Sequence, residues 1–91
     1  MELTFFYLPG CPYCKQAREI MKELITEHPE YANVKITEVN EMTQRKIVSQ
    51  YDYYYVPCFW IGKEKLYEAD PNDPADVVKE KLNAVFQRAL A

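Results

Sequence analysis

Hydrophobic and polar positions alternate in blocks that predict strands and helices in a definite order. The apolar run at residues 2–8 is nearly continuous, which favours a strand covered on both faces. From Pro12 to about Glu27, apolar positions recur every three or four residues, with charged residues between them, so we expect an amphipathic helix. His28 precedes Pro29 and is therefore disfavoured in the helical region, which ends this helix. A second strand is predicted over residues 34–39.

The second half of the chain predicts a short helix, a hairpin and a long helix. Asn40 is the predicted cap of the short helix. Two strands at residues 58–61 and 65–68, separated by a tight turn, make the hairpin. Asp73 is the predicted cap of the last helix, with Pro74 at its first position. The apolar positions that indicate the two helices are Ile47, Val48 and Tyr51 for the first, and Val77, Val78, Leu82, Val85, Phe86, Ala89 and Leu90 for the second.

The predicted order of elements is βαβαββα, which is typical of an α/β fold. The first strand, helix and second strand form a βαβ unit, and such a unit implies a parallel pair of strands with a right-handed crossover. The hairpin then adds antiparallel strands. We therefore predict a four-stranded mixed sheet with helices on both faces, and one domain that spans residues 1–91.

Composition and charge narrow the classes of partner. The chain has 91 residues, 14 of them acidic and 11 basic, and a formal net charge of −3, with no basic stripe of the kind that binds a phosphate backbone. No apolar run approaches the roughly 20 residues that cross a bilayer. We expect a cytoplasmic monomer that binds neither nucleic acid nor membrane.

Two of the three cysteines, Cys11 and Cys14, are separated by two residues at the start of the first predicted helix. Pro12 suits the first helical position, which makes Cys11 the predicted N-cap. Unpaired backbone N–H groups and the positive end of the helix dipole stabilise an anion there, so Cys11 is the predicted nucleophile. Cys14 lies inside the first turn, where its sulfur can attack a mixed disulfide on Cys11, and it is the predicted resolving thiol.

Other uses of the thiols stay open at this point. A zinc site would need two more ligands, and Cys58 and His28 are the only remaining cysteine and histidine. A metal or iron–sulfur carrier could instead use Cys11 from two chains together with added thiols. Cys58 is either a third redox thiol or a small apolar residue of a buried strand. The tyrosines at positions 53–55 either pack over the second helix or form an aromatic wall for a peptide, as in an adaptor.

The sequence Cys11-Pro12-Tyr13-Cys14 resembles the active-site tetrapeptide of dithiol glutaredoxins, and Val56-Pro57 resembles the valine-proline pair that precedes their third strand. The chain is identified as a glutaredoxin-like member of the thioredoxin superfamily. The resemblance implies a thioredoxin-like fold, a cis proline beside the dithiol, and a thiol–disulfide oxidoreductase with no tightly bound cofactor. The substrate-binding residues that it implies are Pro12, Tyr13, Tyr55, Val56 and Pro57.

Three departures from the glutaredoxin pattern bear on glutathione. No lysine precedes Cys11, because residues 7–10 are Tyr-Leu-Pro-Gly, and Tyr55 stands where a threonine is usual. Tyr67-Glu68-Ala69-Asp70 stands near the position of the usual glycine pair. Glutathione carries two carboxylates, which such an acidic loop without a basic partner disfavours. We therefore expect protein or low-molecular-weight disulfides as substrates. The reductant is either a donor of the thioredoxin-reductase type or glutathione. Glutathione is also a candidate substrate.

Overall fold

The computed structural model describes residues 2–91, and its elements follow the predicted order. One element was not predicted, a 3₁₀ helix directly after the first α-helix. The elements are β1 (Leu3–Tyr7), α1 (Pro12–Glu27), η1 (Pro29–Asn33), β2 (Ile36–Asn40), α2 (Arg45–Val48), β3 (Cys58–Ile61), β4 (Glu64–Glu68) and α3 (Ala75–Leu90).

The four strands form one mixed sheet in the order β2-β1-β3-β4, as predicted. β1 pairs in parallel with β2, from Leu3 opposite Ile36 to Tyr7 opposite Asn40. β3 is antiparallel to both β1 and β4, and its pairing with β4 shifts register between Phe59 and Trp60. β1 is therefore an inner strand, and its carboxyl end leads directly to the cysteine pair.

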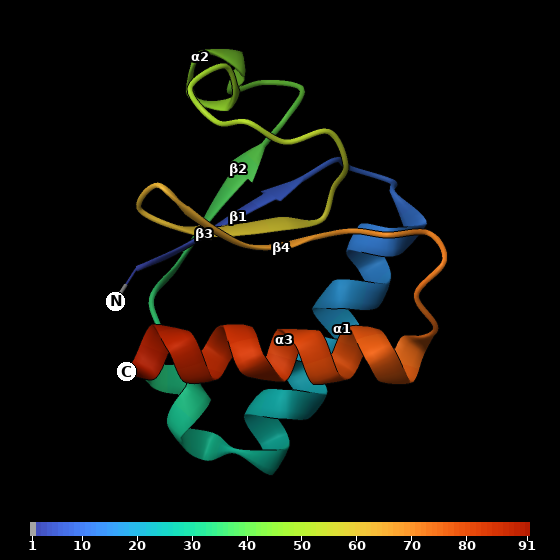
Figure 1. The fold of residues 1–91 in the computed structure, drawn as a ribbon, viewed down its shortest axis with the longest axis vertical. Coiled ribbons are helices and arrows are strands. Elements are labelled where there is room, and N and C mark those ends of the chain that lie inside the picture. The colour runs from blue at the N-terminus through green and yellow to red at the C-terminus, as the bar shows by residue number, and fades with distance from the viewer. Residues whose placement is uncertain (1) are drawn as a thin grey trace.

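Helices cover both faces of the sheet, which confirms the predicted architecture. Figure 1 shows α1 and α3 below the sheet and the short α2 with its following loop above it. β1 serves both layers, because Phe5 belongs to the larger buried cluster with α1 and α3, whereas Phe6 belongs to a smaller one with Val39, Cys58 and Trp60. This alternation follows from the period of two along a strand. It accounts for the continuous apolar run at residues 2–8.

Two helices begin later than predicted. Asn40 stays in β2, and its side-chain oxygen accepts the Met42 N–H, so it forms a turn instead of capping a helix. α2 then begins only at Arg45. In α3, Pro74 is itself the N-cap, with extended backbone, and Asp73 instead binds the Lys81 ammonium at 2.6 Å.

Strand boundaries differ from the predicted ones by one or two residues. β1 covers Leu3–Tyr7 instead of residues 2–8, and β2 ends at Asn40 instead of residue 39. The chain after α1 winds into η1, which delays the start of β2. β2 begins at Ile36, not at residue 34, and β4 begins at Glu64, not at residue 65. Within η1, Tyr31 is buried and stacks on Phe86 with ring centroids 4.8 Å apart. Its hydroxyl donates to Asn83 of α3 at 2.5 Å. Such long-range contacts fix a segment that carries no strong local signal of its own.

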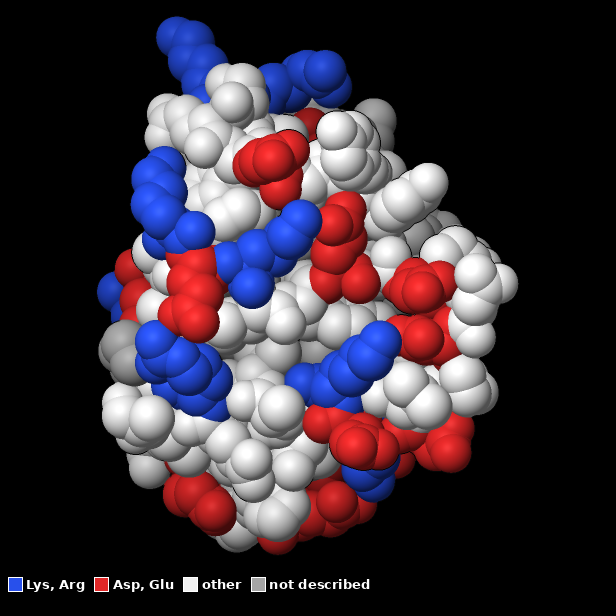
Figure 2. Space-filling model, viewed as in Figure 1, with Lys and Arg blue, Asp and Glu red and all other residues white. Residues whose placement is uncertain are grey.

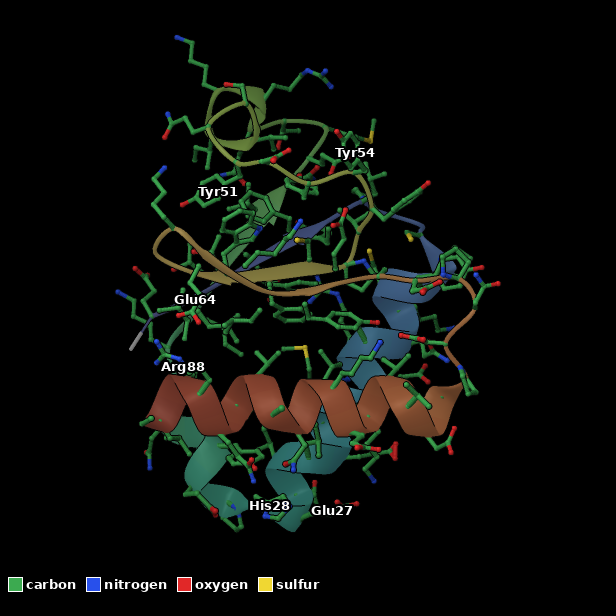
Figure 3. The ribbon with its side chains drawn as sticks, in the orientation of Figure 1. Glu27, His28, Tyr51, Tyr54, Glu64 and Arg88 are labelled. Atoms are coloured by element: carbon green, nitrogen blue, oxygen red, sulfur yellow. The ribbon has the colours of Figure 1, made fainter. Side chains whose placement is uncertain are left out.

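Charged side chains of both signs lie close together on the surface that Figure 2 presents. One of the surface ion pairs joins Arg88 of α3 to Glu64 of β4 at 2.8 Å, and Figure 3 places both residues at the end of α3 where the chain finishes. None of the helices formed by residues 2–91 has the length and apolarity needed to cross a membrane.

Candidate active site

The two vicinal thiols lie at the junction between β1 and α1. β1 ends at Tyr7, and the chain turns through Gly10, whose φ of 80° is a conformation that glycine adopts readily. The Cys11 N–H donates to the Leu8 carbonyl at 3.2 Å, which closes this turn. Cys11 has extended backbone, with φ −74° and ψ 122°, and is the N-cap of α1, as predicted.

Cys11 is partly exposed and faces the amino end of α1. Its carbonyl accepts the Lys15 N–H at 3.0 Å, the first intrahelical hydrogen bond, while its side chain makes no capping hydrogen bond. The N–H groups of the first turn are therefore available to an anion at this position. Pro12 provides none of them and has the backbone angle of a helix from the start.

Cys14 lies behind Cys11 and is only 3% exposed. Burial raises the pKa of the Cys14 thiol, since it disfavours the charged thiolate, and the neighbouring Cys11 adds to the rise. A hydrogen bond from the backbone of Leu8 and the positive charge of Arg18 oppose it. The two thiols thus have unequal surroundings, as the sequence predicted. The raised pKa keeps the Cys14 thiol protonated in the resting protein.

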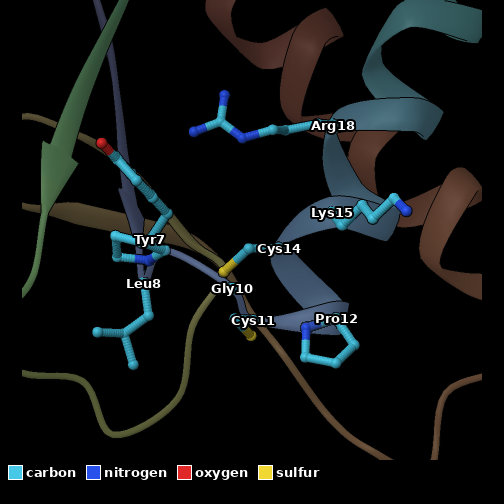
Figure 4. Close-up of a pocket in the computed structure, with 9 residues that line it drawn as sticks. Tyr7, Leu8, Gly10, Cys11, Pro12, Cys14, Lys15 and Arg18 are labelled. Carbon is cyan, nitrogen blue, oxygen red and sulfur yellow. The ribbon is translucent and has the colours of Figure 1, made fainter.

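A cavity of about 530 Å³ opens beside the two thiols. Figure 4 shows Tyr7 and Arg18 on its walls above the sulfur atoms, and Lys15 one turn along α1. The Arg18 guanidinium binds Glu38 of β2 at 2.7 Å and lies 4.8 Å from the centre of the Tyr7 ring. These contacts anchor its positive charge on the same helix face as Cys14, four residues away.

The predicted substrate-binding residues lie around different cavities. The Val56–Pro57 peptide bond is cis, which confirms the expectation from the resemblance. Pro57 lines a small cavity together with Tyr13, which is 48% exposed. Tyr55 borders a separate cavity of about 500 Å³ with Glu68 and Asp70. Pro12 lines the large cavity on the other side of the thiols.

The cis-proline side of the site is acidic, and its cations are already bound. Lys65 binds Glu68 at 2.9 Å, and Lys81 binds Asp73 at 2.6 Å. Burial alone would raise the pKa of Glu68, but hydrogen bonds from the backbone of Tyr54, Lys65 and the backbone of Tyr55 outweigh it and hold that pKa below its usual range. No local sequence pattern predicts these bonds, because Glu68 lies 13 and 14 residues from its backbone partners.

Cys58 follows the cis proline and is fully buried in the smaller core cluster. Its sulfur accepts the Trp60 indole N–H at 3.1 Å. Burial raises the pKa of the Cys58 thiol to about 12. Within residues 2–91, no group of three or more histidine, cysteine, aspartate or glutamate side chains is placed to hold a metal ion. A metal carrier built from this chain would need ligands from a second chain or from added thiols.

The tyrosine run divides into packed and exposed members. Tyr51 and Tyr53 pack on Phe6, with ring centroids 4.8 and 4.9 Å apart. Tyr54 and Tyr55 are 85% and 60% exposed. Figure 3 shows Tyr54 on the loop beside α2, on the opposite side of the sheet from α3. Packing is therefore confirmed for Tyr53, whereas an aromatic wall for a peptide, formed by Tyr54 and Tyr55, stays a prediction.

Comparison with known proteins gives one family match and several fold neighbours. A family model described as Glutaredoxin matches residues 3–66, which is more than half of the chain. The comparison with curated proteins gave no match. Thioredoxin 1 of the thermophilic eubacterium Thermosipho africanus has a similar structure, with a TM-score of 0.60 and 12% identity over 100% of both chains.

Two further solved structures contain a part that is similar to this chain. The J-Trx1 fragment of ERdj5 has a TM-score of 0.61 and 22% identity, over 99% of this chain and 43% of that one. The first two thioredoxin domains of Saccharomyces cerevisiae Eps1p give a TM-score of 0.57 and 21% identity, over 96% of this chain and 34% of that one. The chain thus spans about a third of the Eps1p structure. At these identities the likeness establishes a thioredoxin fold.

Proposed function

The chain belongs to the glutaredoxin family, whose members carry out redox chemistry of thiols and disulfides, and on this basis we propose that it reduces disulfides through Cys11 and Cys14. The observation that carries the proposal is the placement of the two thiols. Cys11 caps α1 and is partly exposed, whereas Cys14 is buried behind it, and both line one cavity. A nucleophile at the surface and a protected second thiol are what a two-step exchange requires.

In the first step the Cys11 thiolate attacks one sulfur of a substrate disulfide. A bond forms between Cys11 and that sulfur, the substrate S–S bond breaks, and the other substrate sulfur leaves as a thiolate that takes up a proton. The N–H groups at the amino end of α1 stabilise the attacking anion. The product of this step is a mixed disulfide between the protein and one half of the substrate.

In the second step Cys14 loses its proton and attacks the Cys11 sulfur. The bond between Cys11 and the substrate breaks, the second substrate thiol is released, and a Cys11–Cys14 disulfide remains. The substrate has gained two electrons, and the protein dithiol has lost two. Arg18 is the cation whose charge favours the Cys14 thiolate, so it assists this step by stabilising the attacking group. A donor must then return two electrons to the protein.

The surroundings of the cis proline favour polypeptide disulfides over glutathione. Glutathione would bring two carboxylates toward Glu68, Asp70 and Asp73, where Lys65 and Lys81 are already bound to acidic side chains. The resulting repulsion and the absence of free positive charge on this side of the described chain weaken a glutathione site. We infer that a reductase of the thioredoxin-reductase type is the better donor.

The test compares the two electron donors directly. Turnover of insulin disulfides by the wild-type protein is measured with glutathione plus its reductase and, separately, with thioredoxin reductase, and the second system should be faster. Cys11→Ser should abolish turnover, Cys14→Ser should accumulate mixed disulfides, and Cys58→Ala should behave as the wild type. Full activity of Cys11→Ser would rule out the mechanism, while faster turnover with glutathione would overturn the choice of donor alone.

A further inference from the structure

Glu68, the last residue of β4, holds the loop that leads to the cis proline. Its Oε2 atom accepts the backbone N–H groups of Tyr54 and Tyr55 at 2.5 and 2.8 Å. Its other carboxylate oxygen, Oε1, accepts the Lys65 ammonium at 2.9 Å. Hydrogen bonds to a charged acceptor are stronger than neutral ones, so this single side chain fixes two consecutive peptide units.

The other side of the same loop is held by the backbone alone. The Ala69 N–H, directly after Glu68, donates to the Pro57 carbonyl at 3.0 Å. The segment between these two attachments is therefore fixed to the end of β4 at both of its ends. Val56 lies between them, and its own backbone N–H and C=O have no hydrogen-bond partner among residues 2–91. These groups are free to pair with an incoming chain.

The side chains of the held loop face outward and border an open cavity. The rings of Tyr54 and Tyr55 are 85% and 60% exposed, although their peptide N–H groups are bonded. Tyr55 and Glu68 border the cavity of about 500 Å³ on this side. Exposed tyrosines on an ordered backbone provide a large contact area at little entropic cost, which is typical of surfaces that bind polypeptides.

We propose that Glu68 is a positioning residue that holds residues 54–56 as a preformed edge on which an extended polypeptide substrate docks beside Cys11. This inference rests on the proposed function and names its substrate class. Backbone groups of the substrate pair with Val56, and its side chains lie against Tyr54 and Tyr55. Glu68 acts through the loop, because three of the roughly four acceptor sites of its carboxylate are used by Tyr54, Tyr55 and Lys65.

A comparison of a large and a small substrate tests the proposal. kcat and KM are measured for an unstructured peptide with a disulfide in its middle and for hydroxyethyl disulfide, which is too small to span the loop. Glu68→Ala should raise KM for the peptide about tenfold, because the docking edge must then be ordered on binding. The kcat/KM for hydroxyethyl disulfide should stay within about twofold of wild type.

Two further variants separate geometry from charge. Glu68→Gln keeps an oxygen at the same reach and should restore most of the peptide KM, whereas Glu68→Asp keeps the charge but withdraws it by one methylene and should not. Glu64→Ala, at the other end of β4, removes an ion pair with Arg88 and is the matched control. If Glu68→Ala does not fold, Glu68→Asp takes its place with the same expectation.

The outcomes distinguish this inference from the proposed function. An inactive wild-type protein would overturn the proposed function itself. An active wild type whose Glu68 variants lose both substrates equally, or lose neither, would overturn the positioning role. The positioning role would also be overturned if Glu68→Asp kept the wild-type KM for the peptide and Glu68→Gln did not. Such a result would mean that the charge of Glu68, and not the held backbone, binds the substrate.

Discussion

Replacing Cys58 with alanine tests whether this thiol belongs to the core or to the redox chemistry. Cys58 is fully buried, and its sulfur is the acceptor of the Trp60 indole N–H at 3.1 Å. Indole nitrogen can only donate, and Trp60 is itself 6% exposed. After the substitution the N–H therefore remains in the core without its acceptor, while nothing at Cys11 or Cys14 changes.

The magnitude follows from the cost of an unpaired buried donor. A buried N–H that loses its partner costs about 1–3 kcal/mol of stability. For a domain of this length, each kcal/mol lowers the melting temperature by about 4–8 °C. We therefore expect Cys58→Ala to melt roughly 4 to 24 °C below the wild type and to keep its full rate of disulfide reduction.

The raised pKa of Cys58 adds a dependence on pH with a definite sign. In the unfolded chain the pKa of this thiol is about 8.5. In the folded protein, burial raises it to about 12. A folded pKa above the unfolded value gives stability that is complete below about pH 8.5 and is lost as pH rises toward the folded value. At about pH 9.5 the advantage of the wild type over Cys58→Ala should therefore be smaller than at neutral pH by on the order of 1 kcal/mol.

Urea denaturation under reducing conditions measures both effects, and Trp60, the single tryptophan, is the fluorescent probe. A double-mutant cycle of Cys58→Ala with Trp60→Phe, followed by circular dichroism, isolates the bond, with an expected coupling of about 1 kcal/mol. The core assignment is refuted if Cys58→Ala slows disulfide reduction at unchanged stability. A gap between the two proteins that widens above pH 8.5 would refute the pKa argument.

Two other predictions concern the dithiol itself. Iodoacetamide at neutral pH should modify one residue per native chain, Cys11, because burial raises the pKa of Cys14 and keeps it protonated. Mass spectrometry of digested protein checks this, and equal labelling of both thiols would contradict the unequal roles. Arg18→Met should prolong the lifetime of the mixed disulfide on Cys11 several-fold, since the Cys14 thiolate loses its neighbouring cation, while Lys22→Met should have no effect. Rapid quenching at different times measures that lifetime, and an unchanged lifetime in Arg18→Met would exclude the role given to this charge.

The parts of the fold that sequence reasoning predicted are those with strong local signals. Helix α1 has a proline at its first position and a regular apolar stripe, and its bounds agree with the structure. Residues 2–8 read as one apolar run because Phe5 and Phe6 pack into different layers of the core. Both signals are present in the local sequence. The order of the elements predicted the mixed sheet, and the resemblance of Cys11-Pro12-Tyr13-Cys14 and Val56-Pro57 to glutaredoxins implied the thioredoxin fold.

The parts that sequence reasoning missed depend on distant partners. Asn40 was predicted to cap a helix, and it suits a turn equally well; its pairing with Tyr7 in the sheet decides between the two. The buried position of Tyr31 depends on α3, which is more than forty residues away. At the site, the thiols could be assigned from their spacing. The bonds of Glu68 to Tyr54 and Tyr55 could not, because no periodicity links a strand end to a loop 13 residues earlier.

Charged side chains have different partners on the two sides of the dithiol, and we infer from this difference which side selects the substrate. On the helix side, Arg18 is bound to Glu38 and acts on Cys14, and Lys15 is an exposed single charge that solvent screens. We expect neither Arg18 nor Lys15 to attract an anionic substrate strongly enough to offset its repulsion by the acidic loop. On the loop side, Glu68 orders a backbone edge and leaves aromatic rings exposed, so recognition there depends on shape and peptide hydrogen bonds. We therefore expect a substrate to be selected by whether it can present an extended segment next to its disulfide, and its net charge to matter little. Selectivity of this kind should persist at high ionic strength, whereas a glutathione site built on charge would weaken.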